Sequence, residues 1–363
     1  MEVGSIFEID IDDLFAEENQ GKELFPFMNK KSYMLDYYNT GRSAIESLFR
    51  FFKKKNENIK VFLPTYNCDS VIRAVERAGV DIEFYSVSVE FSLDGQELET
   101  LMCRPGDVLY LVQYFGKPLQ ADIVDAINTL QNKGVIIVED ISLCLLSSSN
   151  TIGLGDYIIG SLRKWFAIPD GGFIASSKDL PDTKKAQAAN DYTLYYFAAQ
   201  LMKKKYLNAK GFRKEKYLEL TNKAMSILFS DYKIREMSLI SKKLLKAQEI
   251  SSICKRRDEN YKNLYERLSN IPQLKIMVPY QSGVIPLGLV IAVNDRDDLL
   301  SWLIKNDVYC NIHWRTNDYM VQDSGSKWLS KHCLTIPCDQ RYSKISMKKI
   351  EQIIREFFEV QNV

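Results

Sequence analysis

The chain has no long apolar run. None of its 363 residues fall in an apolar stretch of about 18 or more, so we expect no membrane span. The N-terminus is acidic rather than basic and then apolar, which does not fit a secretion signal. The formal net charge is +1, which gives no overall attraction to nucleic acid or to an anionic membrane. We therefore predict a cytoplasmic protein whose partners are small molecules and not nucleic acid.

The histidines and cysteines of the chain form no catalytic or metal-binding motif. The two histidines, His313 and His332, accompany no motif of a serine or cysteine hydrolase. Seven cysteines are scattered and odd in number, which favours free thiols in a reducing compartment. The closest approach to a metal pattern runs from Cys310 to Cys338, and its spacing fits no compact zinc module. We predict no metal ion. The basic clusters at 53–55 and 203–205 are expected to be solvated helix faces.

The order of the apolar runs predicts an α/β fold. Hydrophobic residues make up 46% of the chain, enough for a large core and two domains. Strand-like and helix-like runs alternate through the first half, which favours a mostly parallel sheet flanked by helices. The expected strands are 61–64, 81–87, 108–115, 135–140, 157–162 and 171–176, with helices at 69–78 and 121–133.

The second half predicts a helical connector and a smaller domain. Residues 182–267 look helical and end in a long helix from about Lys242. Strands are expected at 284–293, 308–314 and 333–337, before a terminal helix over 346–360 with Ser346 as its N-cap. We predict a large ligand-binding domain over 1–241, including the N-terminal segment and connector, and a small α+β domain over 242–363.

Two charged residues stand at strand ends. Asp140 ends an apolar strand, and ligands of open α/β sheets bind at the carboxyl ends of strands. The next strand places Lys164 at a comparable terminus, and Gly171 and Gly172 would let the chain turn tightly and re-enter the sheet. Taken alone, Asp140 fits a helix N-cap as well, and Lys164 a surface residue. A lysine in such a crevice can form a Schiff base with a carbonyl.

A third element suits an anion. The segment TGRSAI opens an amphipathic helix, and the backbone N–H groups near Gly41, Arg42 and Ser43 would lie at its N-terminus. An anion cradle, a carboxylate and a lysine are the three contacts that pyridoxal 5'-phosphate needs for its phosphate, pyridine nitrogen and aldehyde. The sequence therefore predicts this coenzyme, bound to Lys164 with Asp140 as partner of the ring nitrogen.

The chain resembles the DegT/DnrJ/EryC1/StrS family of sugar aminotransferases, within the fold-type-I coenzyme enzymes. The likeness rests on the segments YNTGRSAI, LPTYNC, AGVDIEFYSV, VQYFGKP, VEDISL, GDYIIGSLRKWFAIPDGG, SDYKIREMSLISKKLLKA and HCLTIPCDQRYSKISMKKI, in this order. The resemblance implies a homodimer with active sites at the subunit interface. It also implies transfer of an amino group from glutamate to a nucleotide-linked keto sugar, for a surface polysaccharide or a related glycan.

The resemblance assigns roles to further residues. Tyr66 and Cys68 fall in the segment that usually supplies a ring-stacking aromatic, and we favour Tyr66 because it has a π-face. Gln113 falls where the family often has a histidine near the substrate. His313 falls where the small domain faces the substrate, although a packed structural histidine fits equally well. The phosphate turn maps to residues 41–43.

Several positions depart from the family pattern. Leu143 replaces a polar residue beside the ring. Ile159 stands where a serine usually precedes the lysine, and Ser161 is the candidate replacement. The segment 231–235 has no counterpart of the asparagine that reaches the partner's phosphate. These losses leave open a catalytically silent family member.

Two further alternatives are weaker. A coenzyme-dependent sugar dehydratase has a histidine in place of the lysine, and Lys164 argues against it. A nucleotide-dependent dehydrogenase would use Gly153 and Gly155, but these precede a strand rather than a helix.

Overall fold

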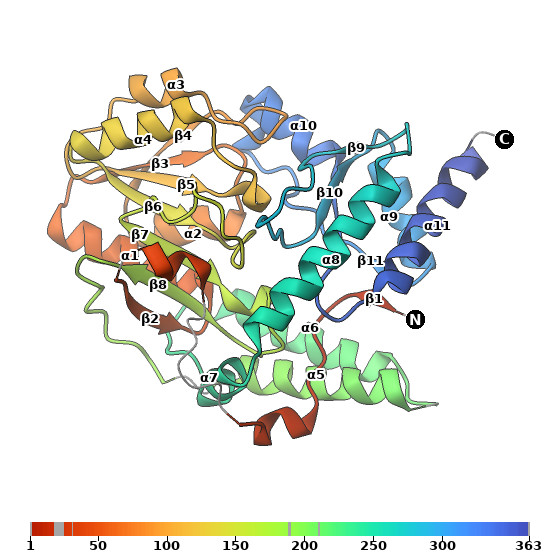
Figure 1. Cartoon of the computed structure of the whole chain (residues 1–363). Coiled ribbons are helices and arrows are strands. Elements are labelled where there is room, and N and C mark those ends of the chain that lie inside the picture. The colour runs from red at the N-terminus through yellow and green to blue at the C-terminus, as the bar shows by residue number, and fades with distance from the viewer. Residues whose placement is uncertain (1, 18–24, 31, 188–189, 210, 362–363) are drawn as a thin grey trace.

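The computed structural model describes residues 2–17, 25–30, 32–187, 190–209 and 211–361. Its largest sheet has seven strands in the order β2-β8-β7-β6-β5-β3-β4 (Figure 1). Their bounds are β2 (Met34–Tyr38), β3 (Lys60–Pro64), β4 (Asp81–Tyr85), β5 (Val108–Val112), β6 (Ile136–Asp140), β7 (Tyr157–Ser161) and β8 (Gly172–Ser176). Strands β3 to β7 pair in parallel, whereas β8 is antiparallel to both β7 and β2.

All six strands expected in the first half are present. Every residue of β5, β7 and β8 is buried, which explains why these runs are apolar without alternation. The edge strand β2 was not predicted, because most of its residues are only partly buried and its pattern MLDYY is short. Helices cover the sheet. They are α1 (Gly41–Lys55), α2 (Asp69–Arg77), α3 (Gly95–Thr100) and α4 (Ala121–Asn132).

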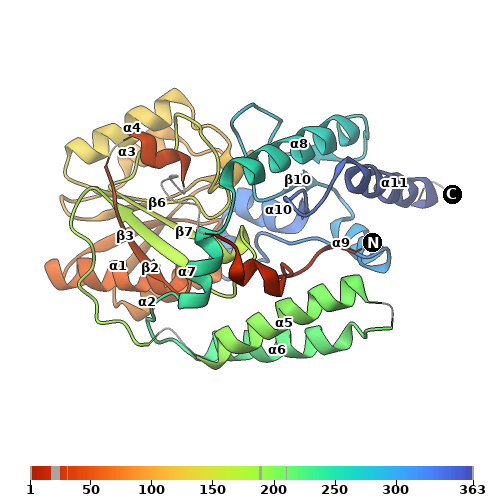
Figure 2. The ribbon, with the colours of Figure 1, turned by 60° about the horizontal axis from the view of Figure 1, so that its bottom comes forward.

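The connector contains two long helices packed side by side, α5 (Asp191–Asn208) and α6 (Glu215–Ser230) (Figure 2). The expected long helix from Lys242 is instead two helices, α7 (Leu239–Lys246) and α8 (Ile250–Leu268). Glu249 leaves the helical region between them, with φ −88° and ψ 89°. The break lets α7 pack Leu244 into the core of the large sheet while α8 packs Leu264 into a separate C-terminal core.

The C-terminal part is built on a small antiparallel sheet of order β12-β10-β9. Its elements are β9 (Lys275–Ile276), β10 (Leu289–Ala292), α9 (Arg296–Lys305), β11 (Val308–Tyr309), α10 (Ser324–His332), β12 (Cys333–Ile336) and α11 (Lys344–Gln361). Short 3-10 helices are η1 (Ile11–Phe15), η2 (Pro26–Lys30), η3 (Tyr114–Gly116), η4 (Leu162–Lys164) and η5 (Met320–Gln322). The smaller α+β unit is therefore present, with strands shorter than expected.

The terminal helix corrects one expectation. Helix α11 begins at Lys344, so Ser346 lies in its first turn and is not the N-cap. Its hydroxyl accepts a hydrogen bond from the Ser343 N–H at 3.4 Å. Ser346 thus supports the start of the helix from within it.

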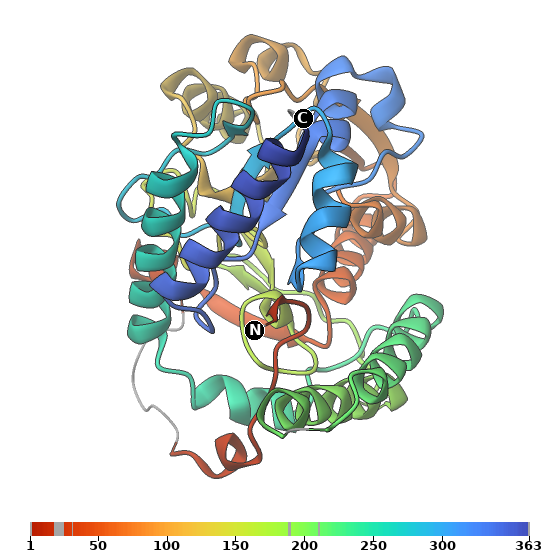
Figure 3. The same cartoon turned by 90° about the vertical axis from the view of Figure 1, so that its right-hand side faces the viewer.

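The N-terminal segment lies against the C-terminal part, although the sequence placed it in the large domain. Strand β1 (Val3–Gly4) pairs in parallel with β11, and Figure 3 shows it between the C-terminal unit and the α5–α6 pair. Lys203 of α5 holds this segment by donating to the carbonyls of Gly4 at 3.0 Å and Ile6 at 2.7 Å. Its side chain is 2% exposed, so the expectation of a solvated face is wrong there. Burial lowers the pKa of Lys203 to about 8. The boundary near 241 stays a prediction.

Candidate active site

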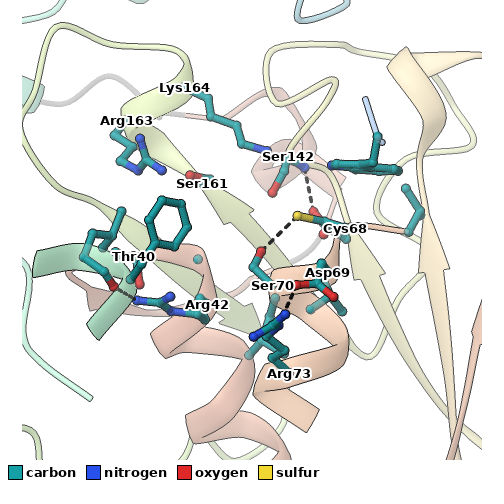
Figure 4. Close-up of a pocket in the computed structure, with 18 of the residues that line it drawn as sticks. Thr40, Arg42, Cys68, Asp69, Ser70, Arg73, Ser142, Ser161, Arg163 and Lys164 are labelled. Atoms are coloured by element: carbon teal, nitrogen blue, oxygen red, sulfur yellow. Dashed lines mark hydrogen bonds and ion pairs between the residues drawn. The ribbon is translucent and has the colours of Figure 1, made fainter. Parts of the chain in front are cut away.

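A cavity of about 600 Å³ lies at the carboxyl ends of the parallel strands. Val112, Asp140 and Ser161, the last residues of β5, β6 and β7, line it. Its other walls come from the N-termini of α1 and α2 and from the C-terminal end of α6 (Figure 4). This is the position at which the sheet topology predicts a ligand.

Asp140 is fixed on the sheet side of this cavity and is 8% exposed. One carboxylate oxygen accepts from the Tyr110 hydroxyl at 2.8 Å, and the other from the Ser142 N–H at 2.8 Å. Burial, followed by the charge of Asp140, raises the pKa of Tyr110 well above its usual value, so its hydroxyl stays a donor. A carboxylate has about four acceptor positions, so Asp140 can still bind a cationic group in the cavity.

Lys164 ends η4, directly after β7, and lines the same cavity as Asp140. The two glycines that follow allow this geometry. Gly171 has φ 149°, and its N–H donates to the Asn39 carbonyl at 2.6 Å. A Cβ on Gly172 would stand 2.3 Å from the carbonyl carbon of Thr40, so β8 can pass the start of α1 only with glycine there. The expected tight turn is confirmed.

The start of α1 provides part of the expected anion cradle. Thr40 is the N-cap, and its hydroxyl accepts from the Ser43 N–H at 3.1 Å. Ser43 is therefore already satisfied, and it does not line the cavity. Gly41 and Arg42 do line it, and first-turn N–H groups have no acceptor within a helix. Ser161 joins them, since its Cβ lies 3.4 Å from an ideal Cβ position on Gly41.

Arginine side chains form a second wall, of which the sequence predicted only Arg42, for its backbone N–H, and not Arg73 or Arg77. Arg42 donates to the Leu228 carbonyl at 2.5 Å, and its guanidinium lies 5.5 Å from the ring centre of Tyr232. Arg77 lies over the same ring at 4.5 Å. Burial, then the charge of Arg77, lowers the pKa of Arg42. Arg73 also lines the cavity. The spacing of four residues between Arg73 and Arg77, on one face of α2, was the available signal.

The structure brings Cys68 to the cavity but not Tyr66. Tyr66 is fully buried, with its ring 5.2 Å from that of Trp314. Trp314 itself lines the cavity, together with Leu143. Trp314 belongs to the C-terminal part of the chain. The sequence did not predict that it reaches the strand ends of the large sheet, because that depends on how the C-terminal part packs against the sheet. The predicted stacking role of Tyr66 is thus not supported by its position; it packs behind Trp314 instead.

Ser161 and Ile159 occupy different depths of β7. Both lie on one face of the strand by its two-residue repeat. Ile159 is 1% exposed and pairs with Asp140 in the sheet register, but it does not line the cavity. Ser161 does line it. The residue of β7 that brings a polar side chain to the cavity is therefore Ser161, two positions after Ile159.

Gln113 lies in the core and not at the cavity. Its side-chain amide donates to a carboxylate oxygen of Glu139 at 2.9 Å and to the Thr151 carbonyl at 2.7 Å. The N–H groups of Gly153 and Gly155 donate to the same carboxylate, the latter at 2.8 Å. The short Gly-x-Gly motif thus holds a buried glutamate rather than a dinucleotide, and Gln113 belongs to that cluster.

His313 lies on the other side of Lys164. Both residues line a second cavity of about 410 Å³ between the sheet and the C-terminal part. The Nδ1 atom of His313 lies 2.9 Å from the Thr335 hydroxyl. Burial, followed by the charge of Lys164, lowers the pKa of His313 to about 3, so the ring is neutral at pH 7. His313 thus lines a cavity that Lys164 also lines, and its expected role near the substrate stays a prediction.

Comparisons with known proteins identify the fold. No family model matches the sequence, and no curated protein matches it. Solved structures match nearly the whole chain. Helicobacter pylori PseC, an aminotransferase involved in pseudoaminic acid biosynthesis, gives a TM-score of 0.67 at 15% identity, covering 99% of this chain and 100% of that one. The fold is that of the sugar aminotransferases.

Two further solved structures have the same fold. A DegT DnrJ EryC1 StrS aminotransferase from Brucella abortus gives a TM-score of 0.61 at 16% identity, covering 94% of this chain and 91% of that one. The GDP-4-keto-6-deoxy-D-mannose-3-dehydratase of E. coli, solved with bound hydrated PLP, gives 0.66 at 12% identity, covering 98% and 100%. The α/β fold-type-I architecture predicted from the sequence is confirmed.

Proposed function

We propose that the chain is a pyridoxal-phosphate-dependent aminotransferase that transfers an amino group, from glutamate, to a nucleotide-linked keto sugar in surface polysaccharide or related glycan biosynthesis. One observation carries the proposal. Lys164 and Asp140 line a single cavity at the ends of adjacent strands, and the N-terminus of α1 lies in the same cavity wall. These are the groups that the aldehyde, the ring nitrogen and the phosphate of this coenzyme require.

The residues present fit the coenzyme. The backbone N–H groups of Gly41 and Arg42 and the hydroxyl of Ser161 would hold its phosphate. Asp140, oriented by Tyr110 and Ser142, would accept the N–H of its ring. Cys68 and Leu143 line the remaining wall. When bound, the coenzyme supplies an electron-withdrawing ring.

Asp140 and Lys164 would have separate roles. Asp140 keeps a negative charge beside the ring nitrogen and so favours its protonated form. Lys164 would hold the aldehyde, and its Nζ atom would accept and return the proton at the substrate carbon. The strand and helix ends around the cavity hold both groups on rigid elements, which fixes their orientation.

The arginine wall supports a nucleotide-linked substrate. Arg42, Arg73 and Arg77 gather on one side of the cavity. Arg73 is paired with Asp69 and Arg77 with Glu46, and the remaining guanidinium N–H groups suit the phosphate oxygens of a nucleotide diphosphate. Tyr232 beside them offers an aromatic face and is 46% exposed. Sugar-nucleotide enzymes among the similar structures agree with this substrate class.

We further propose a cytoplasmic homodimer with the active site at the subunit interface. All seven cysteines are free thiols. Among the described residues, no helix has the length and apolarity needed to cross a bilayer. The cavity extends to Phe229, which is 60% exposed, and Leu194 on the neighbouring α5 is 61% exposed. Exposed apolar side chains beside the cavity support burial by a second subunit.

Two alternatives stay distinguishable. Lys164 disfavours a dehydratase that holds the coenzyme noncovalently, although a dehydratase shares this fold. Leu143, in place of a polar neighbour, motivates a catalytically silent protein that keeps the coenzyme. The test is incubation of the purified protein with coenzyme, glutamate and a panel of keto-sugar nucleotides. Formation of an amino sugar and 2-oxoglutarate supports the proposal, loss of a sugar hydroxyl indicates a dehydratase, and coenzyme binding without any product indicates a silent protein.

A further inference from the structure

Trp314 lines the cavity at the strand ends from the C-terminal part of the chain, and the proposed chemistry gives it no role. Among the described residues, the other aromatic side chains of this cavity are Phe229 and Tyr232, at the end of α6 beside the arginine wall. Cys68 lines the cavity from the segment between β3 and α2, but a thiol has no π-face. Trp314 is thus the aromatic residue of the cavity that lies outside the arginine wall.

Trp314 rests on a cluster of buried aromatic rings. Its ring centre lies 5.2 Å from that of Tyr66, which lies 5.9 Å from Tyr114 and 5.8 Å from Phe91. The Tyr114 hydroxyl donates to the Tyr66 carbonyl at 2.5 Å. Tyr66, Tyr114 and Phe91 are all buried, so the backing of the indole is closely packed. Trp314 itself is half-buried and is the member of this cluster that reaches the cavity.

Side-chain contacts hold the C-terminal part in this position. The hydroxyl of Thr65, directly after β3, donates to a carboxylate oxygen of Asp323 at 3.1 Å. The Tyr319 hydroxyl donates to the carboxylate of Glu76 on α2 at 3.0 Å. Tyr319 and Asp323 follow Trp314 closely in the chain, so the docking of this segment on β3 and α2 sets the position of the indole.

The strand order places Trp314 and Lys164 on opposite sides of Asp140. In the large sheet β6 lies between β7 and β5, and β3 is next to β5. Lys164 follows β7 and extends toward Ser142, whose N–H binds Asp140 (Figure 4). Tyr66, against which Trp314 packs, follows β3. A flat ring between Asp140 and Lys164 would therefore have the indole beside it. A protonated ring also gains from the negative face of an indole.

We propose that Trp314 supplies the aromatic face against the coenzyme ring, in place of the segment between β3 and α2, so that docking of the C-terminal part completes the coenzyme site. This rests on the proposed coenzyme-dependent function. Tyr66 is then a positioning residue that acts through Trp314. The small side chain of Cys68 leaves room for the indole on the side of the cavity where the family resemblance implied an aromatic residue.

Binding of deoxypyridoxine phosphate to the full chain, measured by calorimetry, tests this role. This probe has the ring and the phosphate of the coenzyme but no aldehyde, so its affinity does not depend on a bond to Lys164. Trp314→Leu keeps an apolar side chain on Tyr66 but removes the aromatic face, and it should weaken binding by about tenfold. Trp314→Phe should restore the affinity to within about threefold of wild type. Trp328→Leu is the matched control, because Trp328 stacks on His332 and does not line this cavity.

A probe without the ring separates a lost contact from a disturbed site. Inorganic phosphate, used as a competitor of deoxypyridoxine phosphate, should bind equally to wild type and Trp314→Leu, because the groups at the start of α1 are unchanged.

A variant at the docking contact tests the link to the C-terminal part. Thr65→Val removes the hydrogen bond to Asp323 but keeps the shape of the side chain, and it should weaken deoxypyridoxine phosphate binding severalfold. The same substitution made together with Trp314→Leu should add little, because both act on one contact. Additive losses in the double variant would overturn the link between docking and the coenzyme site.

The outcomes separate this role from the function on which it rests. Equal affinity of wild type and Trp314→Leu for deoxypyridoxine phosphate overturns the role of Trp314. An equal loss of phosphate affinity in Trp314→Leu also overturns it, because the whole site is then disturbed. If pyridoxal phosphate fails to attach to Lys164 while Trp314→Leu still weakens deoxypyridoxine phosphate binding, the function is wrong and the role of Trp314 is kept. No binding of this probe to wild type overturns both.

Discussion

Glu139 and Asp140 are neighbours at the end of β6, and they face opposite sides of the sheet. Glu139 is fully buried, where it accepts from Gln113, Gly153 and Gly155. Asp140 is turned to the cavity that contains Lys164. The same kind of side chain thus serves the core on one face and a ligand site on the other.

The difference lies in what surrounds each carboxylate. Backbone N–H groups of two glycines enclose Glu139, and burial nevertheless raises its pKa. Asp140 has one tyrosine hydroxyl and one N–H, and the remaining space around it is cavity. A strand-end carboxylate is therefore informative about function only when its face of the sheet is open. The following predictions test this contrast from the largest expected effect to the smallest.

Removal of the lysine on the cavity side should have the largest effect. Lys164→Ala should reduce amino transfer at least about a thousandfold, because anchoring and proton transfer are both lost. Lys178→Ala, at a site that is 56% exposed and paired with Asp156, is the control and should retain activity. Initial rates with glutamate and the keto-sugar nucleotide measure the change. Activity within tenfold of wild type in Lys164→Ala would contradict the role.

Substitution of Asp140 and substitution of Glu139 should have different effects on kcat. Asp140→Asn should lower kcat by about a hundredfold or more, since a fixed charge beside the ring nitrogen is lost. Glu139→Gln should leave kcat within a few fold once the protein is folded, because Glu139 does not line the cavity. Single-turnover rates with glutamate measure both. If the rate fell equally in the two variants, the proposed functional difference between the two faces of β6 would be wrong.

The turn at the start of α1 should affect coenzyme affinity. In Gly172→Ala the added Cβ would stand 2.3 Å from Thr40, so the phosphate-binding turn must shift. We expect about tenfold weaker binding of pyridoxal phosphate, from a strain of about 1–3 kcal/mol. Gly41→Ala is the matched comparison. Its Cβ would have no neighbour closer than 3.4 Å, and its affinity should change less. Fluorescence titration with the coenzyme gives both values.

The buried carboxylate should appear in the pH dependence of stability. Because burial raises the pKa of Glu139, the folded state keeps its proton to higher pH than the unfolded chain does. The free energy of unfolding should therefore fall as pH rises above the ordinary glutamate value of 4.5, by at most about 1.4 kcal/mol per pH unit. Glu139→Gln should lack this contribution. Denaturant unfolding of wild type and Glu139→Gln across pH 4 to about 7 measures this contribution. Parallel curves of unfolding free energy against pH for the two proteins would refute the prediction.

The sequence predicted the strand-end chemistry because that chemistry depends on local order. Asp140 and Lys164 each follow an apolar run, and adjacent parallel strands bring such ends together. The position of the arginine wall depends instead on the packing of α2 against the end of α6. A local sequence pattern does not predict such a contact. Tyr66 and Gln113 were placed by resemblance, and their side chains turn into the core. The pairing of β1 with β11 was not predicted, because the two strands lie about 300 residues apart in the sequence.

The central claim concerns which lysine carries the coenzyme. Lys203 is the informative rival, since it is buried and its pKa is lowered to about 8, yet its ammonium is held by backbone carbonyls. The most direct test is to incubate the protein with pyridoxal phosphate, reduce it with borohydride and map the peptides by mass spectrometry. The account predicts a single reduced adduct on Lys164. An adduct on Lys203 or on other lysines, with Lys164 unmodified, would contradict it.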